Sequence, residues 1–182
     1  MTNYINEYYQ KINDGSIIAG YWIKLLYSYI QDGLRRKAFF YDHKKATKAI
    51  LFIETFCHHC EGRNDLLKLE LWQKASLSVI FGIVDSTGAR QWREVVLIVA
   101  RKNGKSLLAA AIIAYMIFLD WEWGAKAFCL APKLDQAEIV YNAFWQTIQQ
   151  EPELSALIKS RKSDYYIEST NSSVKKIAFN AK

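Results

Sequence analysis

Gly104-Lys105-Ser106 is the stretch of this sequence whose residue types are best suited to chemistry. A lysine cation and a serine hydroxyl follow a glycine that leaves the backbone open to close approach, as in sites that bind a phosphate and its Mg²⁺. The apolar, β-branched residues 95–99 precede this stretch and predict a buried parallel strand. The uncharged residues 107–119 follow it and predict a buried helix rich in Ala, Leu and Ile. A strand, a tight loop and a helix in this order form the context in which such a loop binds nucleotide phosphates.

The backbone N–H groups at the start of the predicted helix would face the β- and γ-phosphates, with the helix dipole behind them. A mobile lysine cation adds to this attraction, and a serine hydroxyl reaches Mg²⁺. We therefore predict an ATP site with Ser106 as the metal ligand and with these members: Lys102, Asn103, Gly104, Lys105 and Ser106. The Walker A motif is incomplete, because Val99 stands where the first glycine is expected. A chance Gly-Lys-Ser is the alternative explanation.

The whole loop, Arg101-Lys102-Asn103-Gly104-Lys105-Ser106 after an apolar run and without a first glycine, resembles the deviant Walker A motif of the large terminase subunit of tailed bacteriophages. This resemblance implies an α/β fold with a P-loop NTPase-like parallel sheet and flanking helices. It also implies the ATPase motor that packages double-stranded DNA into proheads. The implied partners are the small terminase subunit and the portal protein, in a homo-oligomeric motor within the cytoplasm of the bacterial host. Arg101 stands where terminases carry an arginine that senses or stabilises the γ-phosphate, so the resemblance implies catalytic roles for Arg101 and Lys105.

A second informative stretch, Leu69-Glu70-Leu71-Trp72-Gln73, lies roughly thirty residues before the loop lysine, and its apolar residues follow helical spacing. Gln73 resembles the adenine-reading glutamine of terminases and related helicase-like motors. A side-chain amide fits this role, because it can donate to N7 of adenine and accept from the N6 amino group. Without the loop downstream, the same pair would only be a buried aromatic ring beside a surface amide.

The remaining pattern predicts elements on both sides of the loop. Residues 1–33 predict two helices separated by Asn13-Asp14-Gly15, the second capped by Ser16 and stopped by Asp32-Gly33. Its apolar face is predicted to comprise Ile17, Ile18, Tyr21, Trp22, Leu25, Leu26 and Ile30. Residues 125–131 predict a second strand, which would complete a strand–helix–strand crossover. A helix capped by Asp135 with Glu138 follows, and then a β-hairpin over 164–169 and 173–179.

These elements suggest a helical N-terminal region over residues 1–62 and the front part of a P-loop ATPase domain over residues 63–182. This domain part is expected to stop before the Walker B strand, the apolar strand that ends in Asp-Glu. The nearest match, Met116–Asp120, lies at the far end of the loop's own helix, about 20 Å from the phosphates by helix length. We therefore expect this chain to contain the phosphate-binding loop but neither the water-positioning acid nor the nuclease acids. The alternatives are an inert nucleotide- or DNA-binding fragment and a helicase-like ATPase that does not come from phage.

Three other features are ambiguous. The basic and aromatic residues of the segment 35–48 could contact DNA, although a solvated helix face is the more common explanation. Lys133 and Gln136 are weak candidates for DNA contact, because this corner faces DNA in helicase-like motors. The segment Cys57-His58-His59-Cys60 could supply zinc ligands, but four contiguous residues can hardly converge on one tetrahedral ion, and a turn is favoured.

Composition agrees with a globular protein that has a polyanionic partner. The formal net charge is +6, and 51% of the residues are hydrophobic. The longest uncharged apolar run has about 13 residues where a membrane span needs about 20, so we expect no membrane segment. No signal peptide is expected, and 3 cysteines make no disulfide framework, which favours a reducing cytosol.

Overall fold

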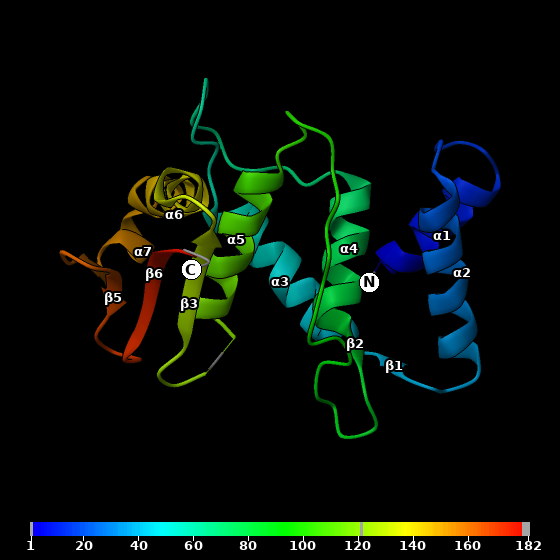
Figure 1. Ribbon diagram of the computed structural model, residues 1–182. Coiled ribbons are helices and arrows are strands. Elements are labelled where there is room, and N and C mark those ends of the chain that lie inside the picture. The colour runs from blue at the N-terminus through cyan, green and yellow to red at the C-terminus, as the bar shows by residue number, and fades with distance from the viewer. Residues whose placement is uncertain (1, 121, 180–182) are drawn as a thin grey trace. The chain divides into compact units, whose positions relative to one another are not determined.

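The computed structural model describes residues 2–120 and 122–179. The chain divides into two compact units, each described here by itself. The first comprises residues 1–51 and 68–97, and the second comprises residues 52–67 and 98–182. Both contain helices, and the second holds a four-stranded sheet, so the α/β class is confirmed (Figure 1). No helix in the described part of the chain is long and apolar enough to cross a membrane.

The first unit is mostly helical. It contains α1 (Tyr4–Asn13), α2 (Tyr21–Arg35), most of α3 (His43–Phe56) and α4 (Leu71–Gly82). Two short strands, β1 (Phe40–Tyr41) and β2 (Ile83–Val84), pair antiparallel. Its core is a cluster of buried residues from these elements: Ile5, Tyr8, Ile12, Tyr27, Ile30, Phe39, Ala75 and Ile83.

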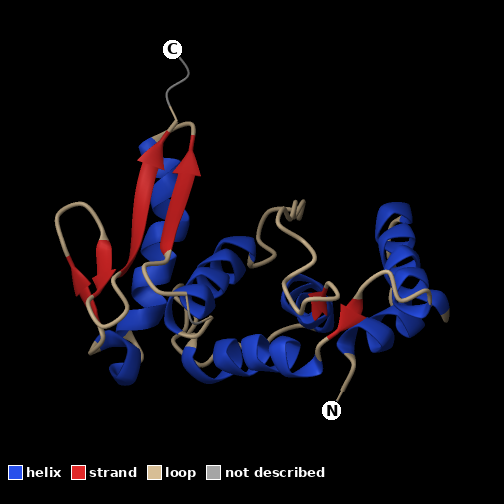
Figure 2. Ribbon diagram, turned by 90° about the horizontal axis from the view of Figure 1, so that it is seen from below, coloured by secondary structure: helices blue, strands red, loops and turns tan. Residues whose placement is uncertain are grey.

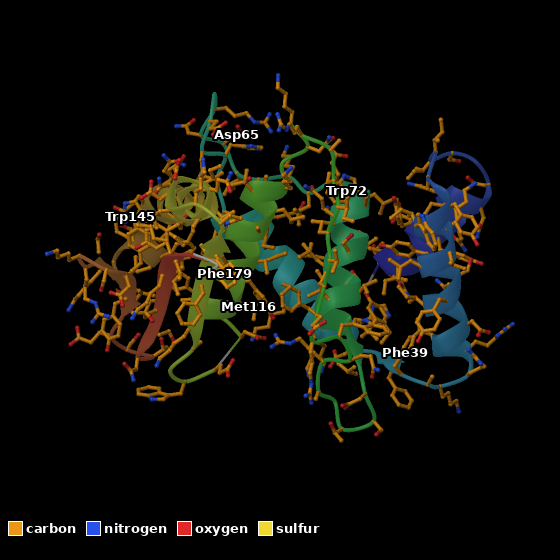
Figure 3. All side chains as sticks on the ribbon, viewed as in Figure 1. Phe39, Asp65, Trp72, Met116, Trp145 and Phe179 are labelled. Atoms are coloured by element: carbon orange, nitrogen blue, oxygen red, sulfur yellow. The ribbon has the colours of Figure 1, made fainter. Side chains whose placement is uncertain are left out.

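The second helix differs from its prediction at both ends. Its N-cap is Gly20 rather than Ser16, and it continues through Gly33 to Arg35. Gly33 lies inside the helix, and the Phe39 ring packs against it: a Cβ on Gly33 would lie 2.2 Å from Cζ of Phe39. Figure 3 shows Phe39 near the C-terminal end of α2. Here glycine allows close packing of a ring against the helix and does not end the helix.

The second unit contains α5 (Lys105–Phe118), α6 (Leu134–Gln149) and the short α7 (Pro152–Ser155). Its strands are β3 (Lys126–Ala131), β4 (Ile158–Ser160), β5 (Tyr165–Ile167) and β6 (Ser172–Ala178). The sheet order is β3-β6-β5-β4. β3 and β6 are parallel and the other pairs are antiparallel, so the sheet is mixed rather than parallel throughout.

Helix α6 covers one face of this sheet, as Figure 2 shows beside the two long parallel strands. The ring of Tyr165 on β5 stacks between Tyr141 and Trp145 of α6, with centroid distances of 4.3 Å to each. Helix α5 packs on α6 through a buried, largely aliphatic face. The predicted strand 125–131, the helix that follows it and the hairpin are therefore confirmed as β3, α6 and β5–β6. The predicted caps of α6 are wrong, because Lys133 is its N-cap and Glu138 instead pairs with Lys176 at 2.6 Å.

The predicted buried strand over residues 95–99 is wrong. These residues have no strand conformation, and Val96 and Ile98 are 84% and 92% exposed. A strand needs a neighbour for its N–H and C=O groups, and no described strand pairs with this segment. The crossover predicted around α5 is consequently not formed, and the parallel pair in this sheet is β3 with β6.

Candidate nucleotide-binding site

The loop that leads into α5 has an unusual backbone conformation at two positions. Lys102 and Gly104 both have left-handed backbone conformations, with φ of 66° and 69°. For a residue with a side chain this region costs about 1–2 kcal/mol, so Gly104 adopts it without strain whereas Lys102 does not. Gly104 is the N-cap of α5 and has no side-chain atom that could occupy the space in front of the helix.

The first turn of α5 presents backbone donors. Leu108 N–H donates to the carbonyl of Gly104 at 2.9 Å, which starts the helix. The N–H groups of Lys105, Ser106 and Leu107 have no acceptor within the helix, and the macrodipole gives this end partial positive charge. An anion of phosphate size fits such an end.

Three basic residues belong to this loop and to the first position of α5. Arg101, Lys102 and Lys105 are all exposed. Within the part of the chain that the structure describes, none of the three pairs with an acidic side chain. Three uncompensated cations on one loop attract a polyanion and remain available to bind it.

Asn103 holds the loop in its bent form. Its side-chain Nδ2 donates to the carbonyl oxygens of Ala100 and Arg101, at 3.3 and 3.2 Å. An amide that closes its own loop does not need to touch the ligand to support binding. Sequence reasoning grouped Asn103 with the ligand contacts and missed this role; the signal available was the preference of Asn for turns with local side-chain-to-backbone bonds.

A buried helix face supports the loop from behind. Leu108, Ala111, Ala114 and Tyr115 are among the buried residues of α5, and the Tyr115 ring meets Phe52 at a centroid distance of 5.8 Å. This packing fixes the direction of α5 within its unit. The side chain at Ser106 is partly buried at the start of the same helix.

Gln73, the predicted adenine reader, lies in α4 of the other unit. It is buried, and its Oε1 accepts a hydrogen bond from the backbone N–H of Glu70 at 2.8 Å. The Glu70 carboxylate accepts from the backbone N–H of Gln73 in return, which completes a capping box. In the structure Gln73 therefore acts as a helix cap, and an adenine contact remains a prediction.

Comparison with known proteins places the chain in a family. Residues 71–181 match the family described as terminase large subunit, ATPase domain. The chain belongs to the terminase large-subunit ATPase family. The match covers more than half of the chain and includes both the loop at 101–106 and Gln73.

Among solved structures, the chain is similar to the large terminase of bacteriophage HK97, with a TM-score of 0.66 and 23% sequence identity. The match covers 76% of this chain and 28% of the HK97 chain, so the protein spans less than a third of that terminase. At this identity the likeness supports the fold. No curated protein sequence matches the chain. The resemblance to the large terminase subunit is therefore confirmed, because residues 71–181 match the ATPase domain of that family.

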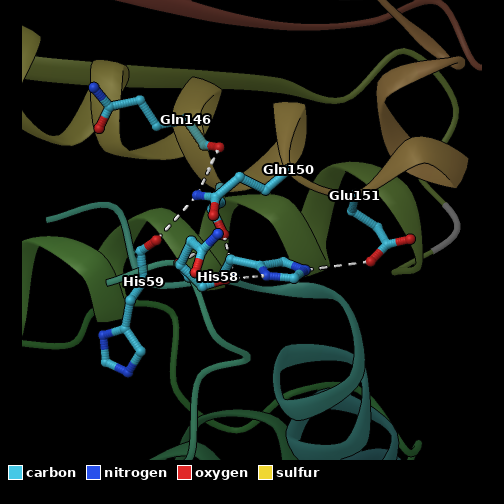
Figure 4. A network of polar contacts seen from close by, with 7 residues as sticks. His58, His59, Gln146, Gln150 and Glu151 are labelled. Atoms are coloured by element: carbon cyan, nitrogen blue, oxygen red, sulfur yellow. Dashed lines mark hydrogen bonds and ion pairs between the residues drawn. The ribbon is translucent and has the colours of Figure 1, made fainter. Parts of the chain in front are cut away.

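The segment Cys57–Cys60 makes polar contacts with the C-terminal end of α6 in this terminase-family fold. His58 N–H donates to Thr147 Oγ1 at 2.6 Å, and His58 Nε2 lies 3.4 Å from Glu151 (Figure 4). Gln150 donates to the carbonyl of His59 at 3.0 Å. The segment is therefore bound along the end of α6. Thr147 and Glu151 were not singled out by sequence, because their partners lie about ninety residues away.

The cysteines of this segment do not form a metal-binding group with the histidines. Burial raises the pKa of Cys57 to about 12, so its thiol is protonated at neutral pH. Cys60 Sγ donates to the carbonyl of Ala143 at 3.4 Å. Over residues 2–120 and 122–179, no group of three His, Cys, Asp or Glu side chains could hold a metal ion.

The DNA-contact candidates lie on exposed surface. Lys133 and Gln136 are exposed at the start of α6, immediately after the carboxyl end of β3. In the basic segment 35–48, Arg35 and Arg36 both pair with Asp32, at 2.5 Å each. Phe39 turns into the core of the first unit, whereas Phe40 in β1 is 44% exposed, so the aromatics of this segment do not lie on one buried helix face.

Proposed function

We propose that this chain is the nucleotide-binding part of a phage DNA-packaging motor, in which ATP hydrolysis drives translocation of double-stranded DNA. The observation that carries the proposal is the exposed cationic turn with two left-handed residues that leads into the N-terminus of α5. Membership in the terminase ATPase family supports it. The division into a helical region over 1–62 and the front of an ATPase domain over 63–182 belongs to the same proposal.

The residues of the loop have distinct roles in this proposal. Lys105 binds the β- and γ-phosphates, and the first-turn N–H groups of α5 bind their oxygens. Ser106 fits Mg²⁺ because it follows Lys105 in the first turn of α5, and a serine hydroxyl at this position of such a loop is a Mg²⁺ ligand. Arg101 stabilises charge on the γ-phosphate during transfer, since a guanidinium matches phosphate geometry and keeps its charge. Lys102 and Asn103 shape the turn, as their backbone and side-chain geometry indicates.

The partners follow from the family. We propose double-stranded DNA, the small terminase subunit, the portal protein and further copies of the same chain as partners, in the cytoplasm of the infected host. The net charge of +6 favours a polyanionic partner. An inert nucleotide- or DNA-binding fragment, or a helicase-like ATPase of another origin, would share the same loop.

Calorimetry with MgATP and MgADP tests the binding role. Loss of a charge-assisted contact costs about 1.5–3 kcal/mol, so Lys105→Ala should weaken binding about 10- to 150-fold. Lys102→Ala is the matched control, because it removes one cation from the same loop and should cost much less. Equal affinities of wild type and Lys105→Ala would exclude the proposed phosphate role.

A second pair of variants separates the two roles of Gln73. Gln73→Ala removes both the cap and the proposed adenine contact, whereas Glu70→Ala removes only the other half of the capping box. Comparison of ATP with GTP binding should show that Gln73→Ala lowers the preference for ATP and that Glu70→Ala keeps it. If both variants retain the preference, Gln73 is a helix cap alone.

A further inference from the structure

The loop before α5 contains the one Asn-Gly pair of the sequence, Asn103-Gly104. The backbone nitrogen of the residue after an asparagine can attack the asparagine side chain, because the ring that closes has five members. A side chain on that next residue hinders the approach, and glycine has none. Asn103 is therefore the asparagine of this chain whose side chain is most open to this attack.

The structure leaves both reacting groups accessible. Asn103 and Gly104 are exposed. Within the part of the chain that the structure describes, the Gly104 N–H donates to no acceptor, so water can remove its proton. The Asn103 amide is held by two bonds, to the carbonyl oxygens of Ala100 and Arg101 at 3.3 and 3.2 Å, and both bonds are exposed to water. Exposed bonds between neutral groups are weak, so the amide leaves these carbonyls readily.

The charges around Asn103 favour replacement of its neutral amide by an anion. Arg101, Lys102 and Lys105 are exposed, and none of them pairs with an acidic side chain among the described residues. Gly104 is the N-cap of α5, so a carboxylate at position 103 would lie directly before a helix N-terminus. The macrodipole stabilises an anion at this end of a helix. A carboxylate at position 103 would therefore supply negative charge to a loop that has only cations.

We propose that Asn103 is a site of spontaneous deamidation, and that this modification weakens phosphate binding by the loop. The Gly104 nitrogen forms a bond to Cγ of Asn103, the Cγ–Nδ2 bond breaks, and the amide leaves as ammonia with the proton from Gly104. Water then opens the five-membered succinimide at one of its two carbonyl carbons and returns a proton to the nitrogen. The product is aspartate, or isoaspartate with one more carbon in the backbone. One water molecule is consumed and one ammonia is released.

The effect on binding rests on the proposed nucleotide function. Both products lose the two donor bonds of the amide and place an anion in the loop beside the phosphates. Isoaspartate also lengthens the backbone directly before the N-cap Gly104. Deamidation should therefore lower the affinity for MgADP about tenfold or more. Bound nucleotide should slow the reaction, because the loop conformation that binds phosphate keeps the Asn103 amide on its two carbonyls.

The rate of deamidation is measured on the full chain, incubated at neutral pH and analysed by peptide mapping with mass spectrometry. Asn103 should react about tenfold faster, or more, than Asn64, an exposed loop asparagine that is followed by Asp65. Asp65→Gly is the matched variant, because it places a glycine after Asn64 and should speed the reaction of Asn64 but not that of Asn103. Equal rates for Asn103 and Asn64 in the wild-type chain overturn the proposal.

Calorimetry with MgADP on the fresh and the incubated chain measures the effect on binding. The incubated wild type should bind about tenfold more weakly or worse, and MgADP should slow the reaction of Asn103 but not that of Asn64. Asn103→Gln, whose longer side chain would need a six-membered ring, should keep its initial affinity through the same incubation. Unchanged affinity after deamidation of Asn103, or an equal loss in Asn103→Gln, overturns the proposal. Rapid deamidation of a chain that binds no nucleotide when fresh would uphold the modification site and refute the nucleotide function instead.

Discussion

Asn103 provides a sharp test of how the nucleotide loop is held. Its amide donates to two carbonyl oxygens of the loop, at 3.3 and 3.2 Å, and both bonds are exposed to water. Such bonds are at the weak end of the range, about 0.5 kcal/mol each. Asn103→Ala should therefore cost about 1 kcal/mol of the closed loop conformation, which lowers nucleotide affinity about fivefold if only that conformation binds.

Asn103→Asp keeps the size of the side chain but replaces the donor with an anion. The carboxylate cannot bond the two carbonyls and also repels the phosphates. At about 6 Å and an effective dielectric constant of about 20–80, each phosphate charge adds about 1–3 kcal/mol. Nucleotide affinity is therefore expected to decrease from wild type to Asn103→Ala and further to Asn103→Asp.

Titration calorimetry with MgADP at two salt concentrations measures both effects. The deficit of the Asp variant should shrink at high salt, whereas that of the Ala variant should not, because screening acts on charge and not on the neutral bonds. Lys102→Ala serves as a control whose deficit also shrinks with salt. If Asn103→Ala binds as wild type does, or if Asn103→Asp binds as well as Asn103→Ala, the loop is not held by this side chain.

Three further predictions concern catalysis and stability. In a protein that hydrolyses ATP, Arg101→Lys should slow turnover by orders of magnitude with little change in nucleotide binding. Lys102→Ala should slow turnover much less. Similar effects of the two substitutions would contradict a special role of Arg101. Gly33→Ala should lower the melting temperature, because overpacking against Phe39 costs about 1–3 kcal/mol and outweighs the roughly 1 kcal/mol gain in helix propensity; a rise would contradict the packing. A hydrogen bond from the Arg161 guanidinium holds the pKa of the buried Asp164 below its ordinary value, so this pair stabilises the fold above about pH 4 and loses its effect as the pH falls through the lowered pKa. Asp164→Asn should accordingly lower the free energy of unfolding by about 2 kcal/mol at pH 7, with the difference closing in acid, as urea denaturation would measure.

The sequence by itself determined the elements whose stability is local. The uncharged stretch after Ser106 is a helix and the run at 125–131 is a strand, because their residues favour these states over several turns or pleats. The turn at Thr170-Asn171-Ser172 forms as predicted, with Asn171 in the left-handed region that Asn tolerates. Family membership was equally accessible, since the six residues from Arg101 to Ser106 are contiguous.

Tertiary structure decided what depends on distant partners. Residues 95–99 favour a strand by composition, yet they are exposed, because a strand forms only where a neighbour accepts its hydrogen bonds. Gly33 ends a helix in the local pattern, but the Phe39 ring packs over it within α2. The apolar face of α2 was predicted as one surface, whereas only the side with Tyr27 and Ile30 is buried. Helical spacing shows which residues share a face, but the direction in which that face points is set by the elements that pack against it.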